Sequence, residues 1–167
     1  MKNESTAYIS LGSNLGDSVL MLKRAVAEIG ALGGCRILAE SRIYLTEPQG
    51  LKNQPWFANQ VIKAGLGGEW EPIPFLAALL AIETRLGRDR KNSVKNGPRL
   101  IDADLLLFND AVLEGPFCVL PHPEMCSRAF VLAPLAELAP ALLLNGKTPA
   151  SWLAALSWRR EGYKIYQ

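Results

Sequence analysis

The sequence has few cysteines, and their spacing supports neither a disulfide framework nor a zinc site. Cys35, Cys118 and Cys126 are odd in number and include no C-x-x-C pair. Small secreted domains use even, closely spaced sets, and structural zinc sites use paired cysteines and histidines. We therefore expect free thiols and a reducing, cytoplasmic environment.

Long apolar runs and targeting signals are also missing. No apolar stretch approaches the ~20 residues that span a bilayer. Residues 1–6 lack the basic-then-apolar pattern of a signal peptide. The net charge of +2 is too small to argue for nucleic acid. We expect a monomer with small-molecule substrates and with neither membrane nor nucleic-acid partners.

Neither of the two common nucleotide-binding motifs is present. Asn145–Thr148 resembles the end of a P-loop, but Ala141 occupies the first glycine position of G-x-x-x-x-G-K-[ST]. Gly12–Gly16 is not G-x-G-x-x-G, and no acidic ribose-binding residue follows at the right distance. If the protein binds ATP, it does so on another fold.

What the sequence does contain is the pattern of one α+β domain over residues 1–167. Hydrophobic residues make up 49% of the chain and charged residues 20%, which is ordinary for a globular protein. Alternating and helical spacings predict strand, helix, strand, strand, helix, strand. This order is the ferredoxin-like βαββαβ repeat, an antiparallel sheet with both helices on one face. The expected strands are 7–11, 36–45, 56–66 and a last one that carries Asp102 and Asp104. Asp17 should cap the first helix, and the second helix should begin at Pro72 and end at Gly87.

A C-terminal β/α extension should follow this repeat. It begins with a loop at 121–123 and a helix from Ser127 that Pro134 interrupts. Thr148 then caps a last helix with Pro149 in its first position. In the second predicted strand, Ile37, Ala39, Ser41, Ile43 and Leu45 should share one face.

Two carboxylates mark the last strand of the repeat as the centre of the chemistry. Asp102 and Asp104 are two residues apart, so they project to the same side, about 6.6 Å apart along the backbone. A core has no use for two unpaired acids, and such a pair suits one or two magnesium ions. Arg99, just before the strand, could hold a phosphate or neutralise an acid. The alternative is a strand end with solvated acids; the apolar run that follows favours the metal site.

The loop 88–99 is the second signal. Five of its twelve residues are basic and almost none is apolar, so it should be mobile without a ligand. A basic loop beside paired acids suits a polyphosphate transferase, in which arginines grip phosphates and loop closure excludes water. A solvated surface loop is the alternative.

Single residues give weaker signals. His122, between two prolines, could donate to a phosphate or be structural. Phe57 and Asn59 share a strand face, and Phe130 lies near Arg128. Two aromatics and an amide could hold a flat heterocycle, but aromatics at such spacing are more often core.

Taken together, these segments resemble the 6-hydroxymethyl-7,8-dihydropterin pyrophosphokinases of folate biosynthesis. The resemblance covers Ala7 to about Pro140. It rests on the motifs AYISLGSNLGD, TEPQGLKNQPWFAN, IETRLGRDR, GPRLIDADLLLF and LPHPEMCSRAFVLAPLAELAP, in that order. It implies transfer of the βγ-diphosphate of ATP, the co-substrate, to the pterin alcohol with two Mg²⁺ ions.

The resemblance also assigns roles to residues. Asp102 and Asp104 look like the ligands of both metal ions, and with Arg88, Arg90 and Arg99 they form the catalytic set. The ATP-binding set is Glu83, Arg88, Arg90, Arg99, Leu105, His122 and Arg128. The pterin-binding set is Thr46, Pro48, Gln49, Phe57, Asn59, Asp102 and Phe130, with Phe57 and Phe130 as the stacking pair.

The chain departs from the family pattern at four positions. Asn96 stands where many members carry a tryptophan that helps to cover the substrates. Phe57 replaces a common tyrosine, Ala103 a branched aliphatic residue, and Phe117 a basic residue seen near ATP in some relatives.

Two other classes stay open on sequence alone. A palm-type nucleotidyl transferase shares the element order and paired acids, but would release pyrophosphate and generally needs acids from several strands. An RNA-binding module would need exposed aromatics in an RNP1-like string, which no strand supplies.

Overall fold

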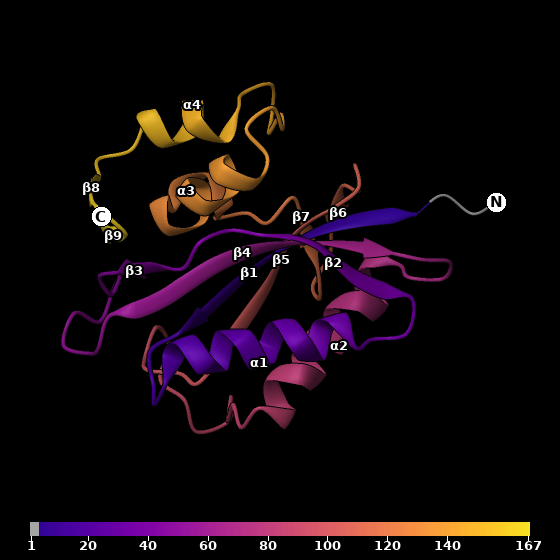
Figure 1. Cartoon of the computed structure of the whole chain (residues 1–167), viewed down its shortest axis with the longest axis horizontal. Coiled ribbons are helices and arrows are strands. Elements are labelled where there is room, and N and C mark those ends of the chain that lie inside the picture. The colour runs from indigo at the N-terminus through magenta and orange to yellow at the C-terminus, as the bar shows by residue number, and fades with distance from the viewer. Residues whose placement is uncertain (1–3) are drawn as a thin grey trace.

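The computed structural model describes residues 4–167 as a mixed α+β fold with helices on both faces of one sheet (Figure 1). Helices α1 and α2 lie below the sheet in this view, and α3 and α4 lie above it. The helices are α1 (Ser18–Gly30), α2 (Pro72–Arg85), α3 (Ala129–Leu138) and α4 (Pro149–Ala154), with a 3₁₀ turn at Met125–Ser127. The main strands are β1 (Ser5–Ser13), β2 (Cys35–Glu40), β3 (Tyr44–Thr46), β4 (Phe57–Leu66), β5 (Asp102–Phe108), β8 (Arg159–Glu161) and β9 (Lys164–Tyr166); β6 (Leu113–Glu114) and β7 (Val119–Leu120) form a separate small sheet.

The sheet runs in the order β5-β1-β4-β3-β9-β8, with β2 also paired to β4. β1 is antiparallel to both β4 and β5. In the register, Gly12 lies opposite Asp102 on one side and opposite Asn59 on the other, while Ser10 lies opposite Asp104. Directly paired residues project to the same face. The register therefore brings these side chains from three strands to one face of the sheet.

Two hydrophobic cores sandwich the sheet. Ile9 and Leu105 pack against Leu22 of α1 and Leu79 of α2 in one of them. The other face packs on α3, and its core contains Leu106 of β5. Because β5 alternates, Asp102 and Asp104 share the face of Leu106, the face covered by α3, as the sequence predicted.

Several local signals are confirmed. Asp17 accepts a hydrogen bond from Leu20 N at the start of α1. Gly87 follows α2 with φ +96°, a conformation that favours glycine. Thr148 caps α4 by accepting from Ser151 N, and Pro149 is its first residue.

Other expectations were wrong. The single strand 36–45 is two strands, β2 and β3. Between them Ser41 N donates to Val61 O and Ser41 Oγ accepts from Val61 N. This break shifts the alternation, so Tyr44 is buried and Leu45 is 41% exposed.

The C-terminal segment also differs from expectation. Pro134 lies inside α3 and does not interrupt it. The β8–β9 hairpin was not predicted, and β9 adds to the edge of the sheet in parallel with β3. Within residues 4–167 no helix is both long and apolar enough to cross a membrane.

Candidate active site

The floor of the candidate site is a row of residues across three strands. Asp102, Gly12 and Asn59 lie side by side on the face of the sheet toward α3. A Cβ atom at Gly12 would lie 2.8 Å from Asn59 Oδ1. Gly12 therefore leaves open the space between the carboxylate and the amide. Asn59 is oriented by its Nδ2, which donates to Thr46 Oγ1 at 2.6 Å.

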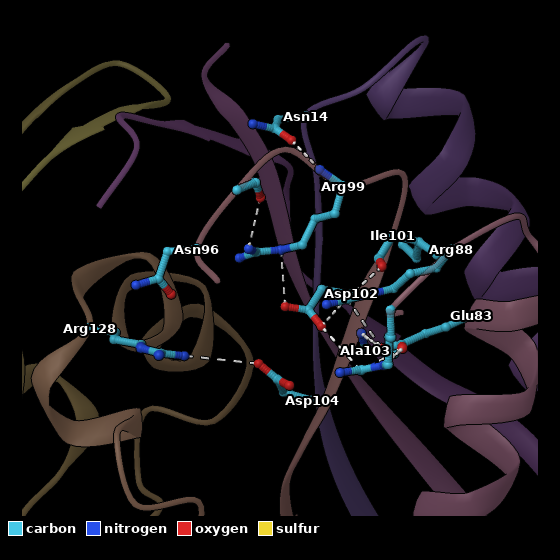
Figure 2. Close-up of polar contacts among 12 residues, drawn as sticks. Asn14, Glu83, Arg88, Asn96, Arg99, Ile101, Asp102, Ala103, Asp104 and Arg128 are labelled. Atoms are coloured by element: carbon cyan, nitrogen blue, oxygen red, sulfur yellow. Dashed lines mark hydrogen bonds and ion pairs between the residues drawn. The ribbon is translucent and has the colours of Figure 1, made fainter. Parts of the chain in front are cut away.

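Asp102 lies close to three arginines of the basic loop, of which Figure 2 shows Arg88 and Arg99. Arg88 Nη1 contacts Asp102 Oδ1 and also donates to Ile101 O at 2.8 Å. Arg99 Nε lies 3.2 Å from Asp102 Oδ2, and Arg90 Nη2 lies 3.8 Å from Oδ1. The structure thus brings together the acid and the basic residues that the sequence singled out.

Glu83 forms hydrogen bonds with Arg90 and with the backbone next to Asp102. Its side chain is fully buried, and Oε1 accepts from the backbone of Ala103, between the two aspartates, at 2.7 Å. Oε2 accepts from Arg90 Nε and Nη2 at 3.0 and 2.6 Å. Burial raises the pKa of Glu83, whereas the Ala103 amide, Arg88 and Arg90 favour its charged form. Glu83 lines none of the cavities described below, so it reaches the site through Arg90 and Ala103.

Asp104 lies on the other side of the site and has fewer partners. Arg128 Nη1 is 3.9 Å from Asp104 Oδ2, pointing across from the start of α3 (Figure 2). Burial first, and then the charge of Asp102, raise the pKa of Asp104 to about 7. Two like charges this close disfavour each other unless a cation joins them.

Three adjoining cavities meet at Asp104. The first, of about 270 Å³, includes Thr46, Gln49, Phe57, Asn59 and Phe130. The second, of about 390 Å³, is lined by Arg88, Arg90, Lys95, Arg99, His122 and Arg128 among others. The third, of about 250 Å³, includes Leu76, Leu105, Phe117, Cys118 and Val119. Asp104 lines all three, and Asp102 lines the first two.

A fourth, larger cavity is separate from these. It measures about 600 Å³ and is lined mainly by apolar residues such as Trp70, Ile73 and Leu113. It shares no lining residue with the other three. Its acidic residue is Glu71, and it holds no counterpart of the charged cluster.

His122 lines both the second and the third cavity. Its Nδ1 accepts from Glu124 N at 3.2 Å, so Nε2 carries the proton in the neutral ring. Burial, and then the charge of Arg128, lower the pKa of His122. In the neutral ring, Nε2–H is available to donate a hydrogen bond to an acceptor such as a phosphate oxygen.

Each of the two aromatic rings of the first cavity makes a cation–π contact with an arginine. The Arg99 guanidinium carbon lies 4.7 Å from the centre of the Phe57 ring, and that of Arg128 lies 5.6 Å from the Phe130 ring. Such contacts hold both the rings and the cations in place. Of the predicted pterin residues, Pro48 is buried and does not line this cavity.

The sequence missed the residues that hold the loops together. Asn14 is buried; its Oδ1 accepts from Arg99 N, and its Nδ2 donates to Gln54 Oε1 and Pro55 O. Gln54 Nε2 in turn donates to Asn96 O. The only signal is amide side chains with several partners, of which Asn14 is buried and Gln54 half-buried. This signal becomes visible only once the fold places three distant loops side by side.

Comparisons with known proteins show the family of the chain. The family model of 7,8-dihydro-6-hydroxymethylpterin-pyrophosphokinase (HPPK) matches residues 8–140. A "2-amino-4-hydroxy-6-hydroxymethyldihydropteridine pyrophosphokinase" from Methylorubrum extorquens is 43% identical over 90% of this chain and 92% of that protein. The protein of the same name from Pseudomonas aeruginosa is 41% identical over 89% of this chain and 90% of its own length.

Solved structures show the likeness of fold. Plasmodium falciparum HPPK-DHPS with pteroate has a TM-score of 0.71 at 13% identity and covers 91% of this chain. This chain spans 42% of that longer chain.

Proposed function

The chain belongs to the 7,8-dihydro-6-hydroxymethylpterin-pyrophosphokinase family, and we propose that it transfers the βγ-diphosphate of ATP to 6-hydroxymethyl-7,8-dihydropterin. The products are AMP and the pterin diphosphate, an intermediate of folate biosynthesis. The observation that carries the proposal is the meeting of three chemically different cavities at one carboxylate, Asp104. A reaction that transfers a diphosphate from a nucleoside triphosphate to a heterocyclic alcohol needs such a junction.

The first cavity is the proposed pterin site. Phe57 and Phe130 supply aromatic faces, and the amide of Asn59 offers hydrogen bonds to the edge of a flat heterocycle. The Thr46 hydroxyl fixes the orientation of that amide. Asp102 and Asp104 line the same cavity, so a hydroxymethyl group pointing toward them lies at the border of the second cavity.

The second cavity is the proposed phosphate site. Its arginines come from the basic loop and from the start of α3, and His122 adds a neutral donor. Arginine forks suit phosphate oxygens, which carry most of the charge of the substrate. Arg88, Arg90, Arg99 and Arg128 are therefore the proposed phosphate ligands, while Glu83 fixes the position of Arg90.

The third cavity is the proposed site of the nucleotide base. Leu76, Leu105 and Val119 make it largely apolar, as a flat base requires. It borders the phosphate cavity at Asp104 and His122. Phe117 is 83% exposed at its rim, where its ring is free to cover a base.

Asp102 and Asp104 fit magnesium, and we propose that they hold two ions. Their carboxylates are hard oxygen donors on one face, and the charge of Asp102 helps to raise the pKa of Asp104, which a cation would reverse. Within residues 4–167 no group of three or more potential ligands forms a closed metal cage. Magnesium commonly uses one or two carboxylates together with substrate phosphates, which matches this arrangement. Bound there, magnesium would neutralise phosphate charge and polarise the transferring group.

The protein side chains then align and stabilise rather than react. The hydroxymethyl oxygen attacks the β-phosphorus, and the bond from that phosphorus to the oxygen bridging the α- and β-phosphates breaks to release AMP. The proton of the hydroxymethyl group passes to solvent. Phosphoryl transfer of this kind has a loose transition state that needs positioning and charge stabilisation more than covalent help. The arginines supply charge stabilisation, and the aromatic walls orient the alcohol. We therefore assign no general base.

Purified protein mixed with ATP, Mg²⁺ and the reduced pterin alcohol tests the proposal. AMP and pterin diphosphate should form together, and omission of the pterin should stop AMP formation. Release of pyrophosphate would point instead to a nucleotidyl transferase. Salt-sensitive RNA binding without any nucleotide product would point to a binding module.

We also propose a topology, a domain extent, an oligomeric state and a cellular location for the protein. The sheet order of β1 to β5, with α1 and α2 on one face, supports a ferredoxin-like βαββαβ topology. We propose that residues 1–167 act as one pyrophosphokinase domain, that the protein is a monomer, and that it works in the cytoplasm.

A further inference from the structure

We infer that Gln167 is a positioning residue that joins the two walls of the pterin cavity and so sets the affinity for pterin; this inference rests on the proposed function. One wall is the segment 46–50, and the other is the segment 127–130. They are about 80 residues apart in sequence. Gln167 follows β9 and forms hydrogen bonds with both.

The wall formed by segment 127–130 contacts the Gln167 carboxamide on either side of Arg128. Gln167 Nε2 donates to Ser127 O at 2.8 Å, and Gln167 Oε1 accepts from Ala129 N at 2.8 Å. A carbonyl can only accept and an amide N–H can only donate, so these partners fix which end of the carboxamide points where. The pattern is that of one step of a parallel β-ladder, in which a residue bonds to the two neighbours of the residue opposite.

This contact replaces a missing cap on α3. Arg128 is the N-cap residue, yet its side chain makes no capping hydrogen bond. The first N–H groups of a helix have no partner within it and usually need one from a side chain. Gln167 supplies that partner for Ala129 and holds Arg128 in an extended conformation, with φ −114° and ψ 110°. Arg128 lines both the pterin and the phosphate cavities, and its neighbour Phe130 is the proposed stacking residue.

The wall formed by segment 46–50 is attached to the same residue. Gln49 Nε2 donates to Gln167 Oε1 at 2.8 Å, and Gln167 N donates to Glu47 Oε1 at 2.8 Å. The parallel pairing of β9 with β3 continues into this contact, because Glu47 N donates to Ile165 O. One half-buried side chain thus connects Gln49 with Ser127 and Ala129 across the edge of the cavity.

A carboxamide is the side chain that fits. Glutamate has the same shape and could still accept from Ala129 and Gln49, but it cannot donate to Ser127 O. It would also place a negative charge beside that carbonyl. Gln167→Glu is therefore the sharper variant, and Gln167→Ala removes all the side-chain bonds. Lys164→Ala is the matched control, since Lys164 lies three residues earlier, in β9, with an exposed side chain.

Binding of two probes separates a role in pterin affinity from a general loss of structure. The nucleotide probe is α,β-methylene-ATP with Mg²⁺, in which the bond that would break is blocked. The pterin probe is 6-hydroxymethylpterin, titrated at saturating α,β-methylene-ATP. We expect both Gln167 variants to raise the Kd for pterin about 10-fold, with less than about a twofold change for the nucleotide. The Lys164→Ala protein should match the wild type for both probes.

The outcomes are distinct. Wild-type pterin affinity in both variants would overturn the inference, as would an equal loss of both probes together with a lower thermal midpoint. Faster amide exchange at Ala129 in Gln167→Ala, measured without ligands, would support the bridge itself. A wild-type protein that neither bound pterin nor formed AMP would overturn the proposed function and this inference together. If the wild type formed AMP and the variants bound pterin equally well, the inference alone would fail.

Discussion

Asp102 and Asp104 differ in their surroundings although they lie two residues apart on one strand. Asp102 is surrounded by Arg88, Arg90 and Arg99, while Asp104 has Arg128 at 3.9 Å and a pKa raised to about 7 by burial and by Asp102. Asp104 therefore needs a bound metal ion more than Asp102 does. The arginines that contact Asp102 are positioned to bind substrate phosphates in its place.

We predict that Asp102→Ala and Asp104→Ala each lower AMP formation by at least about 10²–10³-fold, because loss of one preorganised electrostatic group in such a site has that effect. Turnover in the wild type should depend strictly on magnesium. The measurement is a steady-state AMP assay across a magnesium titration, with circular dichroism to confirm the fold. Asp110→Ala, at an exposed turn beyond the same strand, is the control. Near-native turnover by Asp102→Ala would show the metal assignment to be wrong.

The aromatic pair leads to a second prediction. Phe57→Ala and Phe130→Ala should weaken pterin binding by roughly 0.5–1.5 kcal/mol plus the burial lost, and should hardly change ATP binding. Phe117→Ala, in the third cavity, is the matched control and should affect ATP alone. Titrations of each variant with each ligand make the comparison. Equal losses of both ligands in the Phe57 variant would contradict separate subsites.

At the residue scale, sequence reasoning succeeded where side-chain chemistry is unusual. Paired acids on a strand and a cluster of arginines stand out against any core, and the structure brings them together at the site. Gly12, Asn14, Gln54 and Gln167 could not be found in this way. Their roles come from the register of β1 and from loops that meet only in the folded chain.

At the scale of elements, the attachment of α3 to β3 depends on one carboxylate. Glu137 of α3 accepts from Tyr44 Oη at 2.7 Å, and from Arg42 N and Nε at 3.1 and 3.2 Å. Burial, the largest single effect, acts to raise the pKa of Glu137, but the hydrogen bonds from Tyr44 and Arg42 together outweigh it and lower the pKa. The charged form is thus favoured in the folded state.

We predict that Glu137→Gln lowers the free energy of unfolding at pH 7 by about 1–2 kcal/mol, since it removes charge-assisted hydrogen bonds. A carboxyl whose pKa is lower when folded stabilises the protein above its unfolded pKa of 4.5. The difference from the wild type should therefore shrink as the pH falls below about 4.5. Denaturant unfolding at several pH values measures this. Glu28→Gln, at the exposed pair with Arg85, is the control and should change stability by less than about 1 kcal/mol. A difference independent of pH would contradict the assignment.

Sequence patterns predicted elements well where one rule acted alone. The caps of α1 and α4 and the end of α2 are such cases. The break between β2 and β3 was missed because Ser41 fits the alternating pattern expected of one strand. In the structure its hydroxyl accepts a hydrogen bond from Val61 N, which the sequence pattern does not reveal. The β8–β9 hairpin was missed because its residues are mostly exposed and because β9 pairs with residues of β3 that are 119 positions away in sequence.

At the scale of the whole molecule, the basic loop connects the pterin and phosphate sites. Its two ends are attached: Arg88 donates to Ile101 O, Arg99 N to Asn14 Oδ1, and Gln54 Nε2 to Asn96 O. Its middle is different. Lys91, Asn92 and Ser93 donate hydrogen bonds to Asp89 and Arg90 of the loop itself, and Val94 is 71% exposed. A segment with few contacts to the rest of the protein opens easily to solvent.

We predict that residues 91–95 exchange their amide hydrogens rapidly in the free protein and become protected once nucleotide and pterin are both bound. The five cations of the loop would then lie over the phosphates, and the charge they neutralise would offset the loss of chain entropy. Arg88 and Arg90 act mainly in this closed complex. Truncating either should lower turnover far more than nucleotide affinity, the pattern of an interaction made only in the transition state. Asn96, which is smaller than the tryptophan common in the family, should make closure less tight. Amide exchange across the loop, with the buried amides of β4 as the reference, decides the matter: equal protection with and without the two ligands would show a fixed loop and exclude closure as part of the mechanism.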